Sequence, residues 1–519
     1  MSRITSATLV GVDGVAVEIE VRISSLLPRV DIVGLPEAAV RESSARVRAA
    51  ISSAGARFPE RRVTVNLAPA ELRKSGAALD LPIAVGILAA SAAISGDDVE
   101  GLALIGELAL DGRLRGVRGA LALVIACRDA GCRAVVVPEA NAREASLAPE
   151  IRVYQATCLQ EVLCHITGAE KLAVVESPRA LHFTNPPGPC LSEVRGQEGA
   201  KRALEVAAAG GHGVLLSGPP GSGKTMLARR LPGLLPALDF EAALEATRIH
   251  GAAGRLDEGH PIVTHRPFRA PHHTASTAGL MGGGNPPRPG EVSLAHRGVL
   301  FLDELPEFER RALESLRQVL EERCIRIARA NYSCAFPAHF ILVGACNPCP
   351  CGWFRSGARD CRCDEAAIAR YRRRVSGPLL DRIDLQVEVP AATWRQLEQP
   401  ASGPTSGDIQ RSVEAARAIQ QARGFASNAE IPDRVLDTLV AAVPEARALL
   451  GRAVDSLGLS ARGARRVLRV ARTLADLEAE TAVGPTHIAE ALSYRGAAGA
   501  NELESEFRRS SVQNPSPGH

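Results

Sequence analysis

A chain of 519 residues is too long for a single hydrophobic core, and three or four domains are expected at about 150 residues per domain. The net charge of +3 is close to neutral for this length, so a role with nucleic acid would depend on local basic patches. No apolar stretch reaches the roughly 18–20 residues that a membrane-spanning helix requires, and the first residues lack a secretory signal. These features predict a cytoplasmic protein without a membrane partner.

The chain divides into three blocks with different periodicities. Up to about residue 170, strand-like runs such as VAVEIEVRIS and RRVTVNLAP alternate with helical runs such as LPIAVGILAASAAI, which predicts an α+β or α/β domain. A short linker with PPGP follows, and from about residue 191 helices and short buried strands alternate as in a parallel nucleotide-binding sheet. A second linker at 398–408 precedes a helical region and a tail too polar to pack. The predicted boundaries are 1–170, 191–395, 405–497 and, for the disordered tail, 498–519.

A phosphate-binding loop lies near the middle of the chain, in VLLSGPPGSGKTMLARRL. The pattern G-x-x-x-x-G-K-[ST] stands between a strand-like run and a helix, the context in which it binds a nucleoside triphosphate. Backbone N–H groups wrap the phosphates, Lys224 reaches the β- and γ-phosphates, and the Thr225 hydroxyl ligates Mg²⁺. The predicted ATP-binding residues of the loop are Gly218, Pro219, Pro220, Gly221, Ser222, Gly223, Lys224 and Thr225.

Two further strands supply groups that hydrolysis requires. GVLFLDEL places Asp303 and Glu304 at the end of an apolar run; Asp303 is predicted to hold Mg²⁺, mostly through water, and Glu304 to polarise the attacking water. FILVGACNPCPCG contains Asn347, whose side chain is predicted to sense the γ-phosphate. A turn-forming asparagine before Pro348 is the alternative. The set predicts an enzyme that hydrolyses ATP with Mg²⁺.

In order and residue type these segments resemble the AAA+ ATPases, specifically the magnesium-chelatase-like branch that includes the ComM/YifB proteins. The resemblance covers nearly the whole chain and is carried by stretches such as FRAPHHTAS, PGEVSLAHRGVLFLDEL, SGPLLDRIDLQVEVP and LSARGARRVLRVARTLADL. It implies a multidomain α/β protein with an AAA+ core and an all-α lid. It also implies an adenine-pocket residue, a sensor-1 residue, an arginine finger and a sensor-2 arginine, which are respectively Gln197, Asn347, Arg382 and Arg462.

An arginine finger implies that a neighbouring subunit completes each active site, and the resemblance implies a homo-oligomeric ring, a hexamer. A guanidinium spreads its donors over the charge that develops on the transferred phosphoryl group, which is the physical reason for an arginine there. The alternative for Arg382 is an ion pair within its own chain, with Asp381 or Asp384.

The first 170 residues resemble the Lon-protease-like domain that heads this family. Proteases of that fold use a serine nucleophile and a lysine base. In the matching segments, LRKSGAALDLPIAVGIL and RGVRGALALVIACRDAG, Ala78 takes the nucleophile position and Leu121 the base position. Neither side chain can attack a carbonyl or accept a proton, so the domain is predicted to be proteolytically inactive. A shifted dyad of Lys74 and Ser75 is the alternative.

Four of the twelve cysteines are grouped in CPCGWFRSGARDCRC as two C-x-C pairs. Four thiolates in two close pairs can form a tetrahedral Zn²⁺ site, which would be structural and would staple the loop. Free cysteines in a loop are the alternative, and the family resemblance does not decide between the two. The candidate zinc ligands are Cys349, Cys351, Cys361 and Cys363.

Two segments are candidates for contact with nucleic acid. Arginines are interleaved with Trp353, Phe354 and Tyr371, which together offer phosphate contacts and stacking faces for a single strand. A solvated basic face, or arginines directed at nucleotide across a subunit boundary, is the alternative. The segment 265–291 resembles an inserted segment that points a loop into the ring channel. Its adjacent His272 and His273 lack metal partners at ligand spacing, so contact with a translocated polymer is expected instead.

The resemblance implies a DNA-dependent motor with helicase or branch-migration activity on single-stranded or branched DNA, during recombination of incoming DNA in natural transformation. A magnesium-chelatase-type subunit that drives metal insertion into a porphyrin is one alternative, and a nucleotide-switched scaffold is another. An ATP-dependent protease is disfavoured by Ala78 and Leu121.

Overall fold

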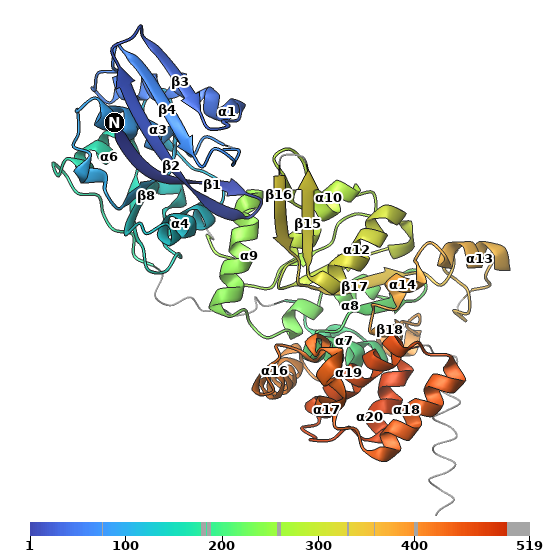
Figure 1. Ribbon diagram of the computed structural model, residues 1–519. Helices are drawn as coiled ribbons and strands as arrows, with labels where there is room; N and C mark the ends of the chain where they lie inside the picture. The colour runs from blue at the N-terminus through green and yellow to red at the C-terminus, as the bar shows by residue number, and fades with distance from the viewer. Residues whose placement is uncertain are drawn as a thin grey trace, which may run out of the picture.

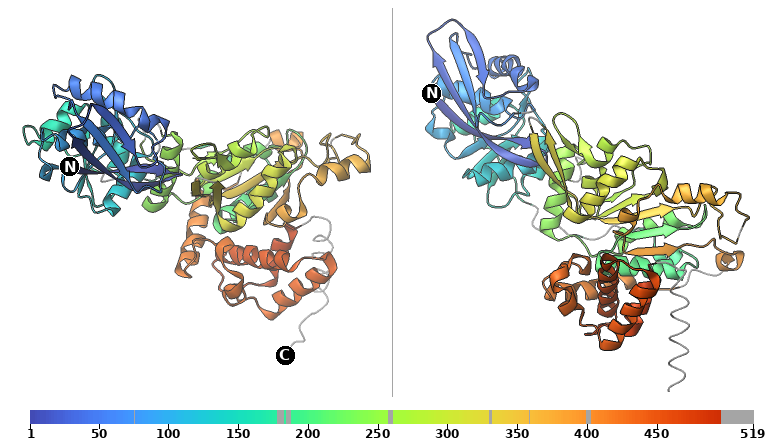
Figure 2. Two further views of the ribbon diagram at one scale, coloured as in Figure 1. Left: turned by 45° about the horizontal axis from the view of Figure 1, so that its top comes forward. Right: turned by 45° about the vertical axis from the view of Figure 1, so that its right-hand side comes forward.

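The computed structural model describes residues 1–74, 76–177, 183, 188–256, 261–329, 332–357, 359–398 and 403–495. Figure 1 shows three parts in succession: a sheet-containing part in blue, an α/β part in green and yellow, and a helical part in orange and red. Both views of Figure 2 show the same succession. Ser75, the predicted tail and parts of both predicted linkers lie outside the described residues.

The N-terminal part is built on a seven-stranded mixed sheet in the order β3-β4-β2-β1-β5-β8-β9. Its first two strands form a long antiparallel hairpin, in which Val10 pairs with Asp13 across a turn where Gly11 has a φ of 70°. A positive φ favours glycine at that position. The strands are β1 (Ser2–Val10), β2 (Asp13–Ser24), β3 (Arg29–Val33), β4 (Arg62–Ala68), β5 (Leu102–Leu104), β8 (Ala134–Pro138) and β9 (Arg152–Ala156), and a separate small hairpin pairs β6 (Glu107–Leu108) with β7 (Leu114–Arg115).

Helices cover both faces of this sheet. Alternate residues along a strand point to opposite faces, and on the two faces they pack in two separate apolar clusters. Ile4 of β1 packs in the cluster that contains α2 and α3, whereas Ala7 packs in the cluster that contains α4. Strands β5 and β8 are buried on both faces, as expected for parallel strands between two helical layers. The helices are α1 (Ala38–Arg41), α2 (Ser43–Ser53), α3 (Asp80–Ala90), α4 (Ala120–Asp129), α5 (Ala142–Ala145) and α6 (Leu159–Ile166).

The central part contains a five-stranded sheet in the order β11-β14-β17-β10-β18, in which all neighbouring strands are parallel. Its inner strands are short apolar runs, as the sequence predicted. The strands are β10 (Val214–Ser217), β11 (Phe268–Arg269), β14 (Val299–Leu302), β17 (Ile341–Cys346) and β18 (Leu385–Glu388). Two hairpins join β12 (Gly282–Gly283) to β13 (Arg288–Pro289) and β15 (Cys324–Arg329) to β16 (Tyr332–Pro337).

Helices surround the central sheet, and the carboxyl ends of its parallel strands meet at one edge. The segments that follow β10, β14 and β17 therefore come together there, and these are the segments with the predicted ATP-site residues. The helices of this part are α7 (Glu198–Gly210), α8 (Lys224–Ala228), α9 (Phe240–Ala253), α10 (Thr277–Met281), α11 (Glu291–Leu294), α12 (Arg310–Glu322), α13 (Glu365–Arg372), α14 (Gly377–Leu380) and α15 (Trp394–Glu398).

The C-terminal part is all-helical and shares one apolar core with the central sheet. The hydroxyl of Thr405 and the carboxylate of Asp408 form a capping box that starts the first helix, whose apolar face packs on α7. The helices are α16 (Ser406–Ala422), α17 (Asp433–Val440), α18 (Pro444–Leu457), α19 (Ala461–Leu477) and α20 (Pro485–Ser493). The mixed α/β architecture with a parallel sheet and a helical C-terminal region agrees with the prediction. No helix in the described ranges is both long and apolar enough to cross a membrane.

Helix α9 joins the N-terminal part to the central part, and Figure 1 shows it between the two. Arg248 of α9 forms an ion pair with Asp13 in the β1–β2 hairpin. Gly251 of the same helix packs against Glu144, where a Cβ would come within 2.7 Å of the carboxylate oxygen Oε1. A side chain at this position would require the Glu144 carboxylate to shift.

Candidate nucleotide-binding site

The phosphate-binding loop connects β10 to α8 at the carboxyl edge of the central sheet. Its turn uses a positive φ at Gly221 (77°) and at Gly223 (93°), which glycine adopts without strain. The ammonium group of Lys224 donates to the carbonyl oxygens of Gly218 (2.7 Å) and Pro219 (2.9 Å). Burial lowers the pKa of Lys224 from its usual value. The lysine is thus folded back over the loop that precedes it.

Two of the three predicted strand-end residues, Asp303 and Asn347, contact this loop. Lys224 Nζ lies 3.2 Å from Asn347 Oδ1, and Thr225 Oγ1 donates to Asp303 Oδ2 at 2.8 Å. A hydroxyl and a carboxylate in contact are oxygen ligands of the kind Mg²⁺ prefers. Glu304 follows in a left-handed conformation (φ 51°), with its N–H donating to Asp303 Oδ1 at 3.0 Å. The structure therefore brings Lys224 next to Asn347 and Thr225 next to Asp303, while the roles predicted for these side chains stay predictions.

Two buried polar atoms near the loop lack partners within the described chain. They are the amide oxygen of Gln197 and the hydroxyl of Ser222. The Gln197 amide nitrogen donates to the carbonyl oxygens of Pro390 (2.6 Å) and Ser222 (3.4 Å), so this side chain is attached to the phosphate-binding loop. An unsatisfied acceptor beside the loop fits the exocyclic amine of an adenine base.

His273 contacts the predicted catalytic carboxylate, a relationship that the sequence reasoning did not identify. Its Nδ1 lies 3.1 Å from Glu304 Oε2, and its ring is 4.1 Å from that of His272 between centroids. Within the described ranges the two histidines do not belong to a cluster of metal-binding side chains. The position of His273 just after β11, the strand next to β14, was the available signal.

Arg382 and Arg462 converge on one carboxylate, Glu321. Arg382 is buried and forms an ion pair with Glu321, while the half-exposed Arg462 approaches the same carboxylate at 3.4 Å. Glu321 lies near the end of α12, which starts soon after Glu304 and extends for about 18 Å at 1.5 Å per residue. Among the described contacts, neither arginine reaches the phosphate-binding loop of its own chain.

The alternative predicted for Arg382 was a pair with Asp381 or Asp384, and the structure shows Glu321 in that role instead. Asp384 is buried and pairs with Arg466 and with His212 Nδ1, at 2.9 Å from the latter. Although burial opposes it, these cationic and hydrogen-bonding neighbours hold the pKa of Asp384 well below its usual range. Arg466 also donates to the Arg382 carbonyl oxygen at 2.7 Å, so α19 is tied to the arginine-bearing loop.

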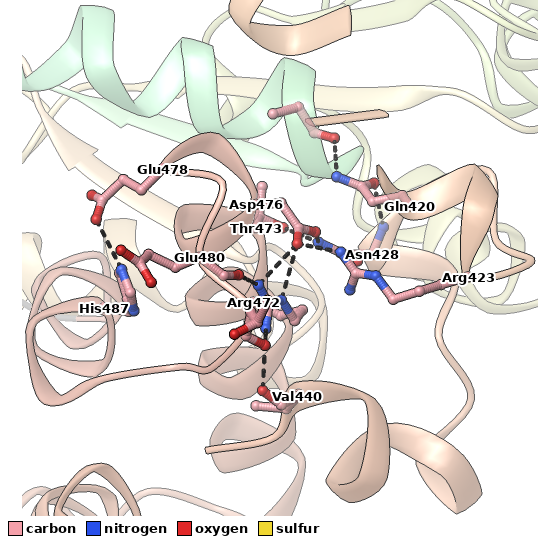
Figure 3. Close-up of polar contacts among 12 residues, drawn as sticks. Gln420, Arg423, Asn428, Val440, Arg472, Thr473, Asp476, Glu478, Glu480 and His487 are labelled. Atoms are coloured by element: carbon pink, nitrogen blue, oxygen red, sulfur yellow. Dashed lines mark hydrogen bonds and ion pairs between the residues drawn. The ribbon is translucent and has the colours of Figure 1, made fainter. Parts of the chain in front are cut away.

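A buried polar network fixes the helical part against the central part. Asn428 donates to Asp476 Oδ2 (2.8 Å) and to Thr473 Oγ1 (3.0 Å), and Thr473 Oγ1 in turn bonds to His212 Nε2 at 2.8 Å. Gln420 donates to the carbonyl oxygen of Ala209 at the end of α7 (3.0 Å). Figure 3 shows the contacts among Gln420, Asn428, Thr473 and Asp476. The lid is therefore held by directional bonds as well as by apolar packing.

The four cysteines of the C-x-C pairs form a cluster immediately after Asn347. All four sulfur atoms lie within 4.8 Å of one another, and Cys349 Sγ lies 3.4 Å from Cys351 Sγ and 3.7 Å from Cys361 Sγ. A tetrahedron of Zn–S bonds of about 2.3 Å places sulfur atoms about 3.8 Å apart, so the donor set fits zinc. The loop also packs on the ATP site, since Gly352 lies against Pro220 of the phosphate-binding loop.

The interleaved aromatic residues beside this cluster are covered by arginines. The guanidinium of Arg359 lies 4.9 Å from the ring centroid of Trp353, and those of Arg355 and Arg372 each lie 5.2 Å from the ring of Phe354. Tyr371 is buried, so its expected role as a stacking face for a nucleic acid is wrong. Tyr371 lines a cavity together with Leu215 of β10 and Val387 of β18, on the side of α13 that faces the sheet.

In the N-terminal part, Ala78 and Leu121 are both buried and belong to the same apolar cluster. No nucleophile or base occupies either position. Lys74 is fully buried and donates to the carbonyl oxygens of Gly34 (2.9 Å) and Pro69, and its burial lowers its pKa. The proposed partner of this lysine, Ser75, lies outside the described residues.

Known protein families match residues in each of the three parts of the chain. The family described as magnesium chelatase, subunit ChlI, matches residues 190–397, its C-terminal family matches 403–495, and a further family, subunit ChlI of Mg-chelatase, matches 19–141.

Full-length relatives agree with these matches. The chain is 43% identical to the "Competence protein ComM" of Haemophilus influenzae over 494 residues, which covers 94% of this chain and 96% of the relative. It is also 43% identical to the "Uncharacterized protein YifB" of Salmonella typhimurium, over 93% of this chain and 95% of the relative. The magnesium-chelatase 38 kDa subunit of Cereibacter sphaeroides is 27% identical over 59% of this chain and 91% of that subunit. The protein therefore belongs to the ComM/YifB family of magnesium-chelatase-like AAA+-type ATPases.

Proposed function

We propose that this protein is a ring-forming ATP-hydrolysing motor that acts on DNA, with helicase or branch-migration activity during the recombination of incoming DNA. The observation that carries the proposal is the convergence of Lys224, Asp303 and Asn347 at one edge of the sheet, within hydrogen-bond distance of the loop or of one another. The relative from Haemophilus influenzae is named a competence protein, which supports DNA as the load.

The residues of the ATP site have distinct roles in this proposal. The loop 218–225 holds the phosphates, and Thr225 and Asp303 hold Mg²⁺, which supplies charge neutralisation at the transferred group when it is bound. Glu304 orients the attacking water, and Asn347 reports on the γ-phosphate. Gln197 contacts the adenine with its unsatisfied oxygen. Glu304 can orient the water only when its carboxylate turns from His273 toward the loop.

Arg382 and Arg462 act on the ATP of a neighbouring subunit. Both lie at Glu321, about one helix length from the residues that follow β14 in their own chain. The ion pair with Glu321 gives the buried guanidinium of Arg382 a counter-charge until a phosphate presents a stronger partner. A closed homo-oligomeric ring, a hexamer, is the assembly in which each chain gives and receives these arginines.

The other parts of the chain support the motor. The N-terminal domain, residues 1–170, is Lon-protease-like and proteolytically inactive because of Ala78 and Leu121. The boundaries 191–395 for the ATPase core and 405–497 for the lid follow from the sequence pattern, and the protein works in the cytoplasm. The cysteine cluster binds one structural Zn²⁺ through Cys349, Cys351, Cys361 and Cys363, and so braces the loop against Pro220.

Contact with DNA comes from the arginine-rich loop and from the segment 265–291. Arg359 and Arg355 are exposed, and the rings beneath them, Trp353 and Phe354, are half-buried. Phosphate groups can displace a guanidinium from a ring at little cost, which leaves the ring free to stack on a base.

The test is steady-state ATPase activity of the purified protein, alone and with single-stranded, duplex and four-way-junction DNA, beside a control with protoporphyrin and Mg²⁺. We expect DNA to stimulate turnover and salt to abolish the stimulation, since phosphate contacts release counterions. An ATPase rate that is the same with and without each of these DNAs contradicts the proposal of a DNA motor. Turnover that responds only to the porphyrin favours the chelatase role, which the relative from Cereibacter sphaeroides represents.

A further inference from the structure

A cavity of about 340 Å³ lies at the opposite edge of the central sheet from the phosphate-binding loop. Its floor is formed by residues at the amino ends of the strands, such as Gly298 and Ile341, and by the start of α9. Its other wall comes from α16 and from the turn Asn428–Glu430 of the helical part. The cavity therefore lies at the joint between the ATPase core and the lid, away from every residue assigned to ATP.

Three arginines line this cavity, and two of them have only main-chain partners. Arg297 is neutralised, because its Nε lies 2.7 Å from Glu245 Oε2. Arg266 donates to the carbonyl oxygens of Pro236 (2.6 Å) and Arg297 (2.7 Å). Arg417 of α16 donates to the carbonyl oxygens of Ala208 (2.8 Å) and Ala426 (2.6 Å). Within the described ranges, neither Arg266 nor Arg417 forms an ion pair with a carboxylate.

The three acidic residues that line the cavity form hydrogen bonds or ion pairs with groups other than Arg266 and Arg417. Asp239 accepts from the N–H of Ala242 at 2.7 Å and caps α9. Glu430 lies 3.0 Å from Arg323 and 3.5 Å from His339. The third, Glu414, is exposed and accepts from Gln410 at 3.0 Å. Within the described chain, Arg266 and Arg417 therefore have no carboxylate within ion-pair distance, although Asp239 attracts Arg266 and Glu430 attracts Arg417 from farther away.

Electrostatics favours a ligand of opposite charge at this place. Burial lowers the pKa of Arg266 and of Arg417 to about 10, and the charge of Arg417 lowers that of Arg266 further. Both remain cations at neutral pH and are only partly exposed, so two like charges line one cavity. A dianion between them offsets both, and the planar fork of a guanidinium matches the oxygens of a phosphate group.

We propose that the cavity is an anion site for a small molecule with a doubly charged phosphate group, which bridges Arg266 of the core and Arg417 of the lid. Its walls are preorganised, because Gln420 and Asn428 bond α16 and the neighbouring turn to α7 and α19 (Figure 3). The site goes beyond the proposed motor function, since neither ATP hydrolysis nor DNA enters the argument. The phosphate group belongs either to free phosphate or to a nucleoside monophosphate.

Titration calorimetry on the full-length Lys224→Ala protein tests this proposal, because that substitution removes the lysine of the ATP site. Inorganic phosphate and AMP are the two probes, in a chloride buffer. We expect saturable binding of at least one probe at one site per chain, and about a tenfold or greater loss of affinity in Arg266→Gln and in Arg417→Gln. Arg411→Gln is the matched control: Arg411 lies on the same helix but is exposed and pairs with Asp408.

Each outcome decides the proposal. Tighter binding of AMP than of phosphate supports the site with a nucleotide as its ligand, and the reverse order supports it with free phosphate. If a glutamine variant does not fold, Arg417→Lys is used instead. It keeps the positive charge but lacks the planar guanidinium, so it should bind the probe with intermediate affinity. Absence of saturable binding of both probes overturns the proposal, as does binding that is equally tight in Arg266→Gln, Arg417→Gln and Arg411→Gln. The measurement does not depend on ATP turnover, so it is separate from any failure of the motor function.

Discussion

Nδ1 of His273 lies 3.1 Å from Oε2 of Glu304, which connects the segment 265–291 to the carboxylate proposed to orient water. An oxygen that is engaged by an imidazole is less available to accept a hydrogen bond from water. A segment proposed to touch DNA is therefore attached to the carboxylate proposed to orient the attacking water. Movement of this segment on DNA would release Glu304 toward the phosphate-binding loop.

The first prediction concerns this pair. Glu304→Gln should still bind ATP, with turnover reduced by about 10²-fold or more, because an amide cannot take up the proton of water. His273→Ala should raise DNA-independent turnover by about two- to fivefold, since an exposed pair is worth up to about 1 kcal/mol. ATPase assays without DNA measure both. His272→Ala is the control and should have little effect; a fall in turnover in His273→Ala as deep as that in Glu304→Gln would show that His273 promotes hydrolysis.

The second prediction concerns the arginines at Glu321. Lys224→Ala lacks the phosphate contact and Arg382→Ala lacks the finger, so each protein alone should be nearly inactive. An equimolar mixture should regain ATPase activity, because Arg382 of a Lys224→Ala subunit can complete the intact phosphate-binding loop of an Arg382→Ala subunit. Turnover of the mixture against time checks this. Full activity of Arg382→Ala alone, or a mixture as inactive as its components, would remove the assignment of a finger acting between subunits.

The third prediction concerns the cysteine cluster. The purified protein should contain about one zinc per chain, and Cys349→Ser combined with Cys361→Ser should lose it. The KM for ATP should rise in this variant, because Gly352 of the same loop braces Pro220. Elemental analysis and steady-state kinetics measure the two effects. Cys164→Ser, a half-buried cysteine outside the cluster, is the control; zinc retained in the double variant would contradict the site.

The fourth prediction is a pH dependence of stability that comes from Glu144. Burial raises the pKa of this carboxyl from 4.5 to about 7, against the opposing hydrogen bond from the Leu121 N–H. The folded state then binds more protons than the unfolded state between these values, so the stabilising effect of the protonated form is complete below about pH 4.5 and is lost as the pH rises through 7. Glu144→Gln mimics the neutral form and should be more stable than the parent at pH 8, by up to about 3 kcal/mol.

Thermal unfolding of the parent and of Glu144→Gln at pH 5 and pH 8 measures this difference. The exposed Glu139→Gln, five residues earlier, is the control and should show no such dependence. An advantage of Glu144→Gln that is the same at both pH values would show that Glu144 is not neutral in the folded protein.

The proximity of Lys224 to Asn347 and of Thr225 to Asp303 could be predicted from the sequence because these residues stand in short, ordered patterns. Lys224, Asp303 and Asn347 each end or follow an apolar strand, and parallel strands bring their carboxyl ends to one edge. The grouping of four cysteines was likewise visible, since two C-x-C pairs lie in one short loop. In these cases the local sequence pattern is enough to predict which side chains lie close together in the fold.

Contacts between distant elements could not be predicted in this way. The pairing of Arg382 with Glu321 depends on how the loop after α14 packs on α12, and neighbours in sequence suggested Asp381 or Asp384 instead. Tyr371 was misplaced because an aromatic residue among arginines looks the same whether its helix face is buried or exposed. Arg266 and Arg417 come from two parts of the chain whose contact is set by α7 and the shared apolar core.

The most direct test of the central claim is the movement of a labelled four-way DNA junction, followed in real time with ATP. The account predicts that the parent protein converts the junction to its branch-migration products only with hydrolysable ATP, and that Glu304→Gln binds the junction without converting it. Conversion by Glu304→Gln at the parent's rate, or a junction left unchanged by the parent while it hydrolyses ATP, would contradict the account.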